Sequence, residues 1–121
     1  MTKLSSLLAA LALAGCYSMS YAQVSAQGGA LVGPNGMTLY TFDKDMAGSG
    51  KSVCNGGCAT NWPPMTATMA PSGDGYSLVT RDDGTQQVAY KGKPLYYWSQ
   101  DTKPGDKGGD GKLNMWHTAT P

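Results

Sequence analysis

Short segments in which apolar and polar residues alternate, separated by turns rich in Gly, Asn and Asp, extend through most of the chain. Alternation with a period of two predicts β-strands. Two pairs of such segments each flank a turn, at 30–32 with 37–42 and at 76–81 with 86–90. Asn35-Gly36 in the first turn and Asp83-Gly84 in the second are strong hairpin signals.

The rest of the chain gives no helical signal, because no window of useful length has helical periodicity without a Gly or a Pro. A third turn at 91–93 leads into another strand at 94–98, where Pro94 fits a strand start or an edge. The Gly-, Lys- and Asp-rich stretches 46–52 and 102–112 are predicted to be exposed loops. The predicted fold class is therefore all-β.

One phrase in this pattern occurs twice. Gly-x-x-Leu-Tyr-x-aromatic-x-x-Asp is found at 36–45 and again at 92–101. Trp62 follows the first copy at about the interval at which Trp116 follows the second. Repetition on this scale indicates one structural unit used twice.

The length leaves room for a single small domain. We expect a β-rich domain over 28–121, with tandem repeats at about 28–67 and 76–121. The two pseudo-repeated hairpin units are predicted to share a small sheet or sandwich.

Strand geometry assigns a face to each residue of the phrase. Side chains two apart point the same way, so Tyr40 and Phe42 share one face and Leu39 points to the other. Asp45 follows where the strand gives way to a loop, and its carboxylate suits an Asx-turn there. The second copy repeats this arrangement with the corresponding residues Leu95, Tyr96, Trp98 and Asp101.

The first 22 residues have the pattern of an export signal, with Lys3 ahead of an unbroken apolar run at 7–14. Two processing sites remain open. Leu13-Ala14-Gly15-Cys16 resembles a lipobox, which would leave a lipidated Cys16 and a short tether, whereas Ser20-Tyr21-Ala22 fits an ordinary signal peptidase. We favour the lipobox, since a cysteine directly after such a run is an unusual coincidence.

The lipobox predicts an outer-membrane or periplasmic lipoprotein, and the other site predicts a soluble periplasmic or secreted protein.

Export also affects the oxidation state of the cysteines. Once Cys16 is acylated or removed, Cys54 and Cys58 remain as a pair, and an oxidising compartment favours a disulfide between them. A reactive redox pair is the minor alternative, because the spacing is Cys-x3-Cys and not Cys-x2-Cys.

The charge balance excludes one class of partner. The chain has 9 Lys and Arg against 8 acidic residues, all Asp, without a basic cluster. Nucleic-acid binding needs such a cluster, so none is expected. Contact with a membrane is expected only through a lipid anchor.

Taken together, these residues resemble a family of small bacterial secreted lipoproteins with a Tyr-x-(Phe/Trp/Tyr)-x-x-Asp motif. The resemblance covers roughly residues 28–121 and rests on both motif copies and five further segments: Cys54-Asn55-Gly56-Gly57-Cys58, Asn61-Trp62-Pro63-Pro64, Arg81-Asp82-Asp83-Gly84-Thr85, Lys91-Gly92-Lys93-Pro94-Leu95-Tyr96 and Trp116-His117. It implies a protein of the bacterial envelope and leaves the biochemical activity open.

Metal binding is one candidate chemistry. Asp101, Asp106 and Asp110 lie among glycines and could supply oxygen ligands to a weak calcium site. Met115 and His117 alternate on one strand face, a combination that suits copper. Solvated turn acids and a packed or surface histidine are the alternatives that we favour, so no cofactor is expected.

Catalysis has little support, because the only histidine has no Gly-x-Ser-x-Gly elbow to accompany it and no carboxylate pair stands out. The aromatic and acidic motif residues could instead stack on and hydrogen-bond a glycan or peptide, or form the core of a structural protein. The candidate ligand face consists of Tyr40, Phe42, Asp45, Trp62, Tyr96, Trp98, Asp101 and Trp116. Exposure of Tyr97 and the three tryptophans separates the two hypotheses.

The function predicted from these features is an exported cell-envelope module of unknown activity, non-enzymatic, with a binding or structural role. Its partner would be a glycan or an envelope protein. A weak calcium- or copper-binding protein and an envelope redox accessory are the alternatives.

Overall fold

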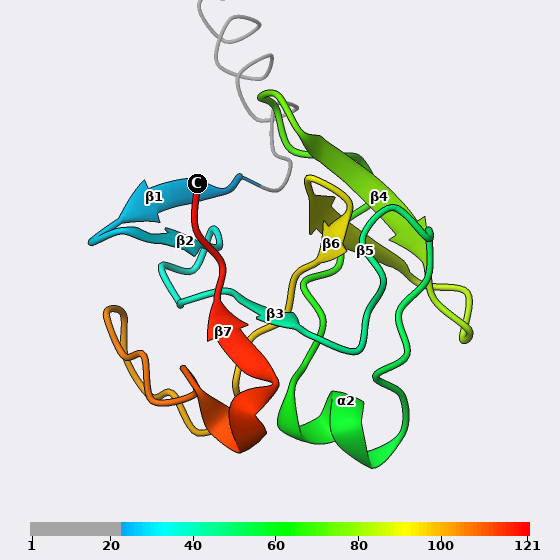
Figure 1. Ribbon diagram of the computed structural model, residues 1–121. Coiled ribbons are helices and arrows are strands. Elements are labelled where there is room, and N and C mark those ends of the chain that lie inside the picture. Colours follow the sequence, from blue (N-terminus) through cyan, green and yellow to red (C-terminus); the bar gives the residue numbers. More distant parts are fainter. Residues whose placement is uncertain (1–22) are drawn as a thin grey trace, which may run out of the picture.

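Short β-strands and long turns build residues 23–121, the part of the chain that the computed structural model describes (Figure 1). The strands are β1 (Ser25–Gln27), β2 (Ala30–Val32), β3 (Tyr40–Phe42), β4 (Tyr76–Thr80), β5 (Gln86–Tyr90), β6 (Lys93–Pro94) and β7 (Trp116–Thr118). Two short helical segments are α2 (Gly57–Asn61) and the 3₁₀ helix η2 (Lys112–Asn114). The predicted processing sites at Cys16 and Ala22 lie outside the described residues.

All the strand pairs of this region are antiparallel, in sheets β1–β2, β3–β7 and β4–β5–β6. The predicted all-β class is confirmed. The β4–β5 hairpin has the expected turn, with Tyr76 opposite Tyr90 and Thr80 opposite Gln86. In the described residues no helix has the length and apolar composition needed to span a membrane.

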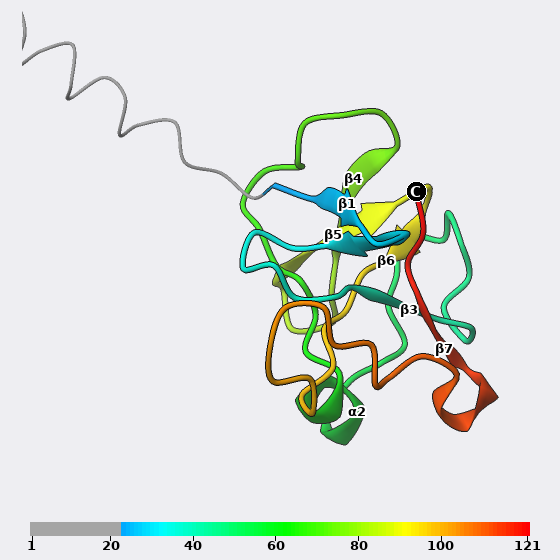
Figure 2. The same ribbon diagram turned by 90° about the vertical axis from the view of Figure 1, so that its left-hand side faces the viewer.

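One helical turn was not predicted. α2 has only five residues, too few for a periodic signal, and it lies at the end of the molecule opposite β1 (Figures 1 and 2). Gly56 precedes it with φ 57°, and its last turn closes when Trp62 N–H donates to the Cys58 carbonyl over 2.8 Å. A buried Trp62 and the disulfide at Cys58 therefore fix this helix from outside.

Each motif copy pairs with the segment that follows the other copy. β3, in the first copy, pairs with β7, and Phe42 lies opposite Trp116. In the second copy, Tyr97 N–H donates over 2.7 Å to the carbonyl of Pro63, which lies in the segment that follows the first copy. The two repeats are therefore intertwined, and neither could form its sheet from its own sequence alone.

Leu95 of the second copy pairs in the same way with the segment that follows the first copy. Met65 N–H donates to the Leu95 carbonyl over 3.0 Å, and Pro64 forms an antiparallel bridge with Tyr96. Trp62-Pro63-Pro64 thus crosses from the first repeat to the second, and Met65 continues along the second motif.

The apolar core reflects this exchange. Leu31, Leu39 and Ala119 are joined in a ring by three backbone hydrogen bonds of 2.8 to 2.9 Å. An equivalent ring of 2.8 to 3.0 Å bonds joins residues of the second unit, namely Val88, Leu95 and Met65. These six buried side chains form one cluster, and both motif leucines lie in it as predicted.

Candidate functional site

A motif tyrosine of each repeat is hydrogen-bonded to the motif aspartate of the other. Tyr96 Oη donates to Asp45 Oδ2 over 2.5 Å, and Tyr40 Oη donates to Asp101 Oδ2 over 2.5 Å. The backbones of Tyr40 and Tyr96 also bond each other in both directions, over 2.7 and 2.9 Å. The two copies of the motif are thus related by an approximate two-fold axis, and each donates a tyrosine hydroxyl to the aspartate of the other.

The aspartates do not form the Asx-turns that the sequence predicted. Asp45 Oδ1 accepts from Val53 N–H over 2.8 Å, and Asp101 Oδ1 accepts from Gly108 N–H over 3.1 Å. Both donors lie on the far side of the loop that follows each copy. Because the second oxygen of each carboxylate is held by a tyrosine of the other copy, the carboxylates tie a loop to the core instead of capping their own strands.

Burial changes the acid–base properties of these groups. Removal from water raises the pKa of Asp45, which is 9% exposed, although hydrogen bonds from Tyr96 and Val53 and the charge of Arg81 oppose this. Burial also raises the pKa values of Tyr40 and Tyr96 above their ordinary range, and their bonds to the carboxylates add to the effect. Both phenols therefore remain protonated donors at neutral pH.

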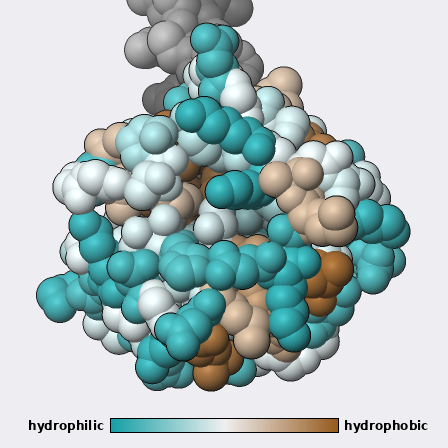
Figure 3. Space-filling view, viewed as in Figure 1, coloured by the Kyte–Doolittle hydropathy of each residue, from teal (hydrophilic) through white to brown (hydrophobic). Residues whose placement is uncertain are grey.

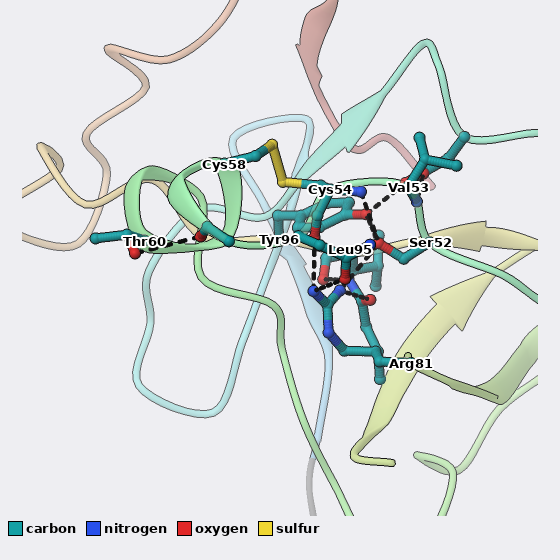
Figure 4. Close-up of a disulfide and its surroundings, with 12 residues drawn as sticks. Ser52, Val53, Cys54, Cys58, Thr60, Arg81, Leu95 and Tyr96 are labelled. Atoms are coloured by element: carbon teal, nitrogen blue, oxygen red, sulfur yellow. Dashed lines mark hydrogen bonds between the residues drawn. A yellow bond between two sulfur atoms is a disulfide. The ribbon is translucent and has the colours of Figure 1, made fainter. Parts of the chain in front are cut away.

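A buried arginine connects this network to the disulfide (Figure 4). Arg81 is 5% exposed, and its guanidinium donates to Ser52 Oγ over 2.9 Å and to the Cys54 carbonyl over 2.6 Å. Ser52 Oγ lies 2.6 Å from the Tyr96 hydroxyl. The hydroxyl groups of Ser52 and Tyr96 thus link the Arg81 guanidinium to the buried carboxylate of Asp45.

The predicted disulfide between Cys54 and Cys58 is present. Cys54 is fully buried, and its carbonyl is held by Arg81. Sequence reasoning did not identify this role of Arg81. The signal for it is strand alternation, since Arg81 falls on the same face as the buried Val79.

The aromatic residues considered as a ligand face form a second core cluster. Trp62 and Trp116 stack with ring centroids 3.9 Å apart, and Phe42 stacks on Trp116 at 4.2 Å. Of the tyrosines and tryptophans in this cluster only Trp98 is partly exposed; the buried ones are Tyr40, Trp62, Tyr96 and Trp116. The predicted shared faces of the two motif copies are confirmed by this packing.

Glycines of the second loop cover the edge of this cluster. A Cβ at Gly109 would lie 2.8 Å from Trp62, and one at Gly108 would lie 2.6 Å from Trp98. The ammonium group of Lys112 lies 5.1 Å from the Trp98 ring. The loop 102–112 is therefore not wholly exposed, because only glycine lets its backbone approach the tryptophans so closely.

Little of the aromatic cluster is open to solvent. On the face shown in Figure 3, hydrophilic and near-neutral residues cover most of the surface and strongly hydrophobic residues occur in separate spots. Tyr97 is also half-buried, with its hydroxyl directly over Gly33. The tryptophans thus serve mainly as packing, and the aromatic face gives a ligand little access.

The carboxylates considered for calcium are held by separate donors. Asp101 bonds Tyr40 and Gly108, and Asp110 accepts from Thr118 N–H over 3.0 Å. Asp106 closes a local turn, where backbone N–H groups and a lysine hold its pKa well below its usual range. Within residues 23–121, no group of three or more His, Cys, Asp or Glu side chains could hold a metal ion.

The two residues considered for copper have different surroundings. Met115 packs against the aromatic cluster, whereas His117 is exposed and its Nε2 lies 2.9 Å from Asp43 Oδ2. A pocket of about 420 Å³ opens beside this His117–Asp43 pair, between the β3–β7 ribbon and the β5–β6 turn. We refer to it as the open pocket.

These features define a class of protein: a disulfide-bonded all-β domain made of two intertwined copies of one motif. Residues 22–66 and 77–120 each match the model of a family described as a secreted repeat of unknown function. The chain belongs to this family and is an exported module, as the sequence predicted. No curated protein and no solved structure matches it.

Proposed function

We propose that the chain is a non-enzymatic binding module of the bacterial cell envelope. Its rigid core would present a polar surface site to a glycan of the envelope. Cys16 would carry a lipid that anchors the domain in the outer membrane or holds it in the periplasm.

The observation that carries this proposal is the saturation of both Tyr–Asp contacts. A general acid or base must reach a reacting group, yet the Tyr40 and Tyr96 hydroxyls are directed at carboxylates inside the core. Both tyrosines are fully buried. The motif therefore supports the fold, and the open pocket is the better place for a ligand.

The test uses the full-length protein purified from its native membrane and labelled with a fluorophore. Saturable co-sedimentation with isolated envelope polymers, reversed by unlabelled protein, supports the proposal. Absence of binding to every envelope fraction, or release of polymer fragments by the protein, would overturn it.

Intact mass spectrometry of the same preparation tests the anchor separately. An acyl mass on Cys16 supports the lipoprotein, and a mature N-terminus at Gln23 overturns that part of the proposal.

A further inference from the structure

The open pocket has a mostly polar lining and borders the first core cluster at Ala119 and Tyr90. Side chains from both repeats line it, among them Thr41 and Asp43 near β3, Lys91 and Lys93 near β6, and His117 and Thr118 on β7. Its volume of about 420 Å³ is within the range of small-molecule sites, roughly 300 to 1,000 Å³.

The approximate two-fold symmetry explains why this pocket is open. Thr41 and Tyr97 each follow the motif tyrosine, and each faces the hairpin turn of the other repeat. Tyr97 extends over its turn so closely that a Cβ at Gly33 would collide with its hydroxyl. Thr41 is much shorter, so the equivalent space on its side is left unfilled.

Tyr90 lies two residues after Val88, as Gly33 lies two residues after Leu31 in the equivalent ring, and it lines the pocket without filling it. Its ring lies 4.8 Å from that of Tyr76, and a Cβ at Gly75 would be 3.2 Å from it. The tyrosine is therefore directed along the β4–β5 hairpin. The position over Gly33 thus holds the hydroxylated ring of Tyr97, whereas the equivalent position beside Thr41 is free to bind a ring from a ligand.

The polar groups around the open pocket indicate the chemistry of that ring. Two lysines, Lys91 and Lys93, line the pocket against the single acidic residue Asp43, so the lining suits an anionic ligand. The hydroxyls of Thr41 and Thr118 can exchange hydrogen bonds with ligand hydroxyls. Asp43 Oδ2 lies 2.9 Å from His117 Nε2, and the other oxygen of this carboxylate can accept from a ligand hydroxyl at the same edge.

The backbone fixes one of the lysines at the pocket. Lys91 has φ 50°, a left-handed conformation that is uncommon for residues other than glycine. The next residue, Gly92, accepts a hydrogen bond from Gly48 N–H over 3.0 Å, and a Cβ at Gly92 would collide with that nitrogen. The turn that carries Lys91 is therefore held against a second loop.

We propose that the open pocket binds one acidic sugar ring, with Lys91 and Lys93 at its carboxylate and the threonine hydroxyls and Asp43 at its hydroxyl groups. This inference rests on the proposed function and names its site and ligand class. The lining favours a sugar over an aromatic side chain, because hydroxyl and charged groups predominate.

The test titrates the full-length protein with D-glucuronate and, in parallel, with the neutral sugar D-glucose, and follows the backbone amides by NMR. Glucuronate should shift the amides of Thr41, Lys91, Lys93, His117 and Thr118. Glucose should bind at least several-fold more weakly. Equal binding of both sugars, or shifts confined to other residues, would overturn the proposal.

Thr41→Tyr fills the pocket in the way that Tyr97 fills its counterpart, so the fold already accepts tyrosine at this position of the motif. It should weaken glucuronate binding at least tenfold. Thr80→Tyr, at an exposed strand position of β4, is the matched control and should bind normally. Lys93→Ala should weaken glucuronate binding several-fold, whereas Lys51→Ala should not.

The two proposals fail in different ways. If Thr41→Tyr binds glucuronate normally, the open pocket is not the glucuronate site. If it loses glucuronate but keeps full binding to the envelope, the pocket is not the site through which the protein binds the envelope. If the wild-type protein binds no envelope fraction, the proposed function itself fails.

Discussion

Replacing Tyr96 by Phe removes one hydroxyl from the centre of the fold and tests the reciprocal Tyr–Asp contacts directly. The hydroxyl donates to Asp45 over 2.5 Å and lies 2.6 Å from Ser52 Oγ. After the substitution, Asp45 keeps its bond from Val53 N–H, and Ser52 keeps its bond from Arg81. The main loss is therefore one hydrogen bond to a buried carboxylate.

The magnitude follows from the burial of that carboxylate. A hydrogen bond to a charged group contributes about 1.5 to 3 kcal/mol, and an unsatisfied buried acceptor costs the upper end of this range. Asp45 is only 9% exposed, so we expect Tyr96→Phe to lower the free energy of unfolding by about 3 kcal/mol. Tyr40→Phe should cost a comparable amount. Asp101 is half-buried, so water can replace the phenol there, but the buried Gly109 N–H also loses its acceptor.

The assay is equilibrium unfolding in urea, followed by tryptophan fluorescence, together with thermal melting. A loss of 3 kcal/mol corresponds to a decrease in Tm of roughly 12 to 24 °C for a domain of this size. The cost should shrink as the pH falls through the pKa of Asp45, because the protonated carboxyl no longer needs the donor. That pKa is raised by burial, and loss of the Tyr96 hydrogen bond raises it further.

A double-mutant cycle supplies the control. Tyr96→Phe and Asp45→Asn should be strongly coupled, whereas Tyr96→Phe and Asp101→Asn should be additive within about 0.5 kcal/mol. Equal coupling of Tyr96 to both aspartates, or a loss below about 0.5 kcal/mol for Tyr96→Phe, would refute the reciprocal arrangement.

Three further outcomes are expected. Arg81→Met should lower the free energy of unfolding by about 3 kcal/mol in urea unfolding, because the Cys54 carbonyl loses a charged donor; an unchanged midpoint would contradict this. Reduction of Cys54–Cys58 should lower the free energy of unfolding by only about 2 kcal/mol, since the closed loop is short. Urea unfolding in the presence of dithiothreitol measures this loss. Complete unfolding on reduction would show that the disulfide contributes more than loop closure. The folded-state pKa values of Tyr40 and Tyr96 are raised above 10.0, so their contribution to stability is present below that pH and is lost as the pH rises towards them. Absorbance from the tyrosinates of Tyr40 and Tyr96 should therefore appear together with unfolding. Ionisation of both in the folded state would contradict this.

Local patterns predicted the strands well and the partners of polar groups poorly. Alternation placed Leu39 in one core cluster and Tyr40 in the other, because the side-chain period of a strand depends only on local geometry. The partner of Asp45 could not be predicted in this way. An Asx-turn was the nearest local solution, but a tyrosine distant in sequence bonds the carboxylate instead.

The same limit applies to pairing and to loops. The repeat predicted two equivalent units, but the exchange of the segments around Trp62 and Trp116 depends on long-range contacts that no local pattern encodes. Gly108 and Gly109 looked like loop residues by composition, and only the approach of two tryptophans shows why glycine is required.

Exchange and reciprocal bonding together explain how two repeats with small cores become one stable domain. Each unit of about half the chain could bury little apolar surface alone. By giving the segment that follows its motif, together with its tyrosine hydroxyl, to the other unit, each repeat makes its own folding depend on its partner. Such mutual dependence fixes the motif residues, which explains why Tyr and Asp recur in both copies. It leaves positions that face outward free to differ, and Thr41 and Tyr97 do differ. A duplicated scaffold can in this way keep its symmetry in the core while one side gains an open pocket and the other remains closed.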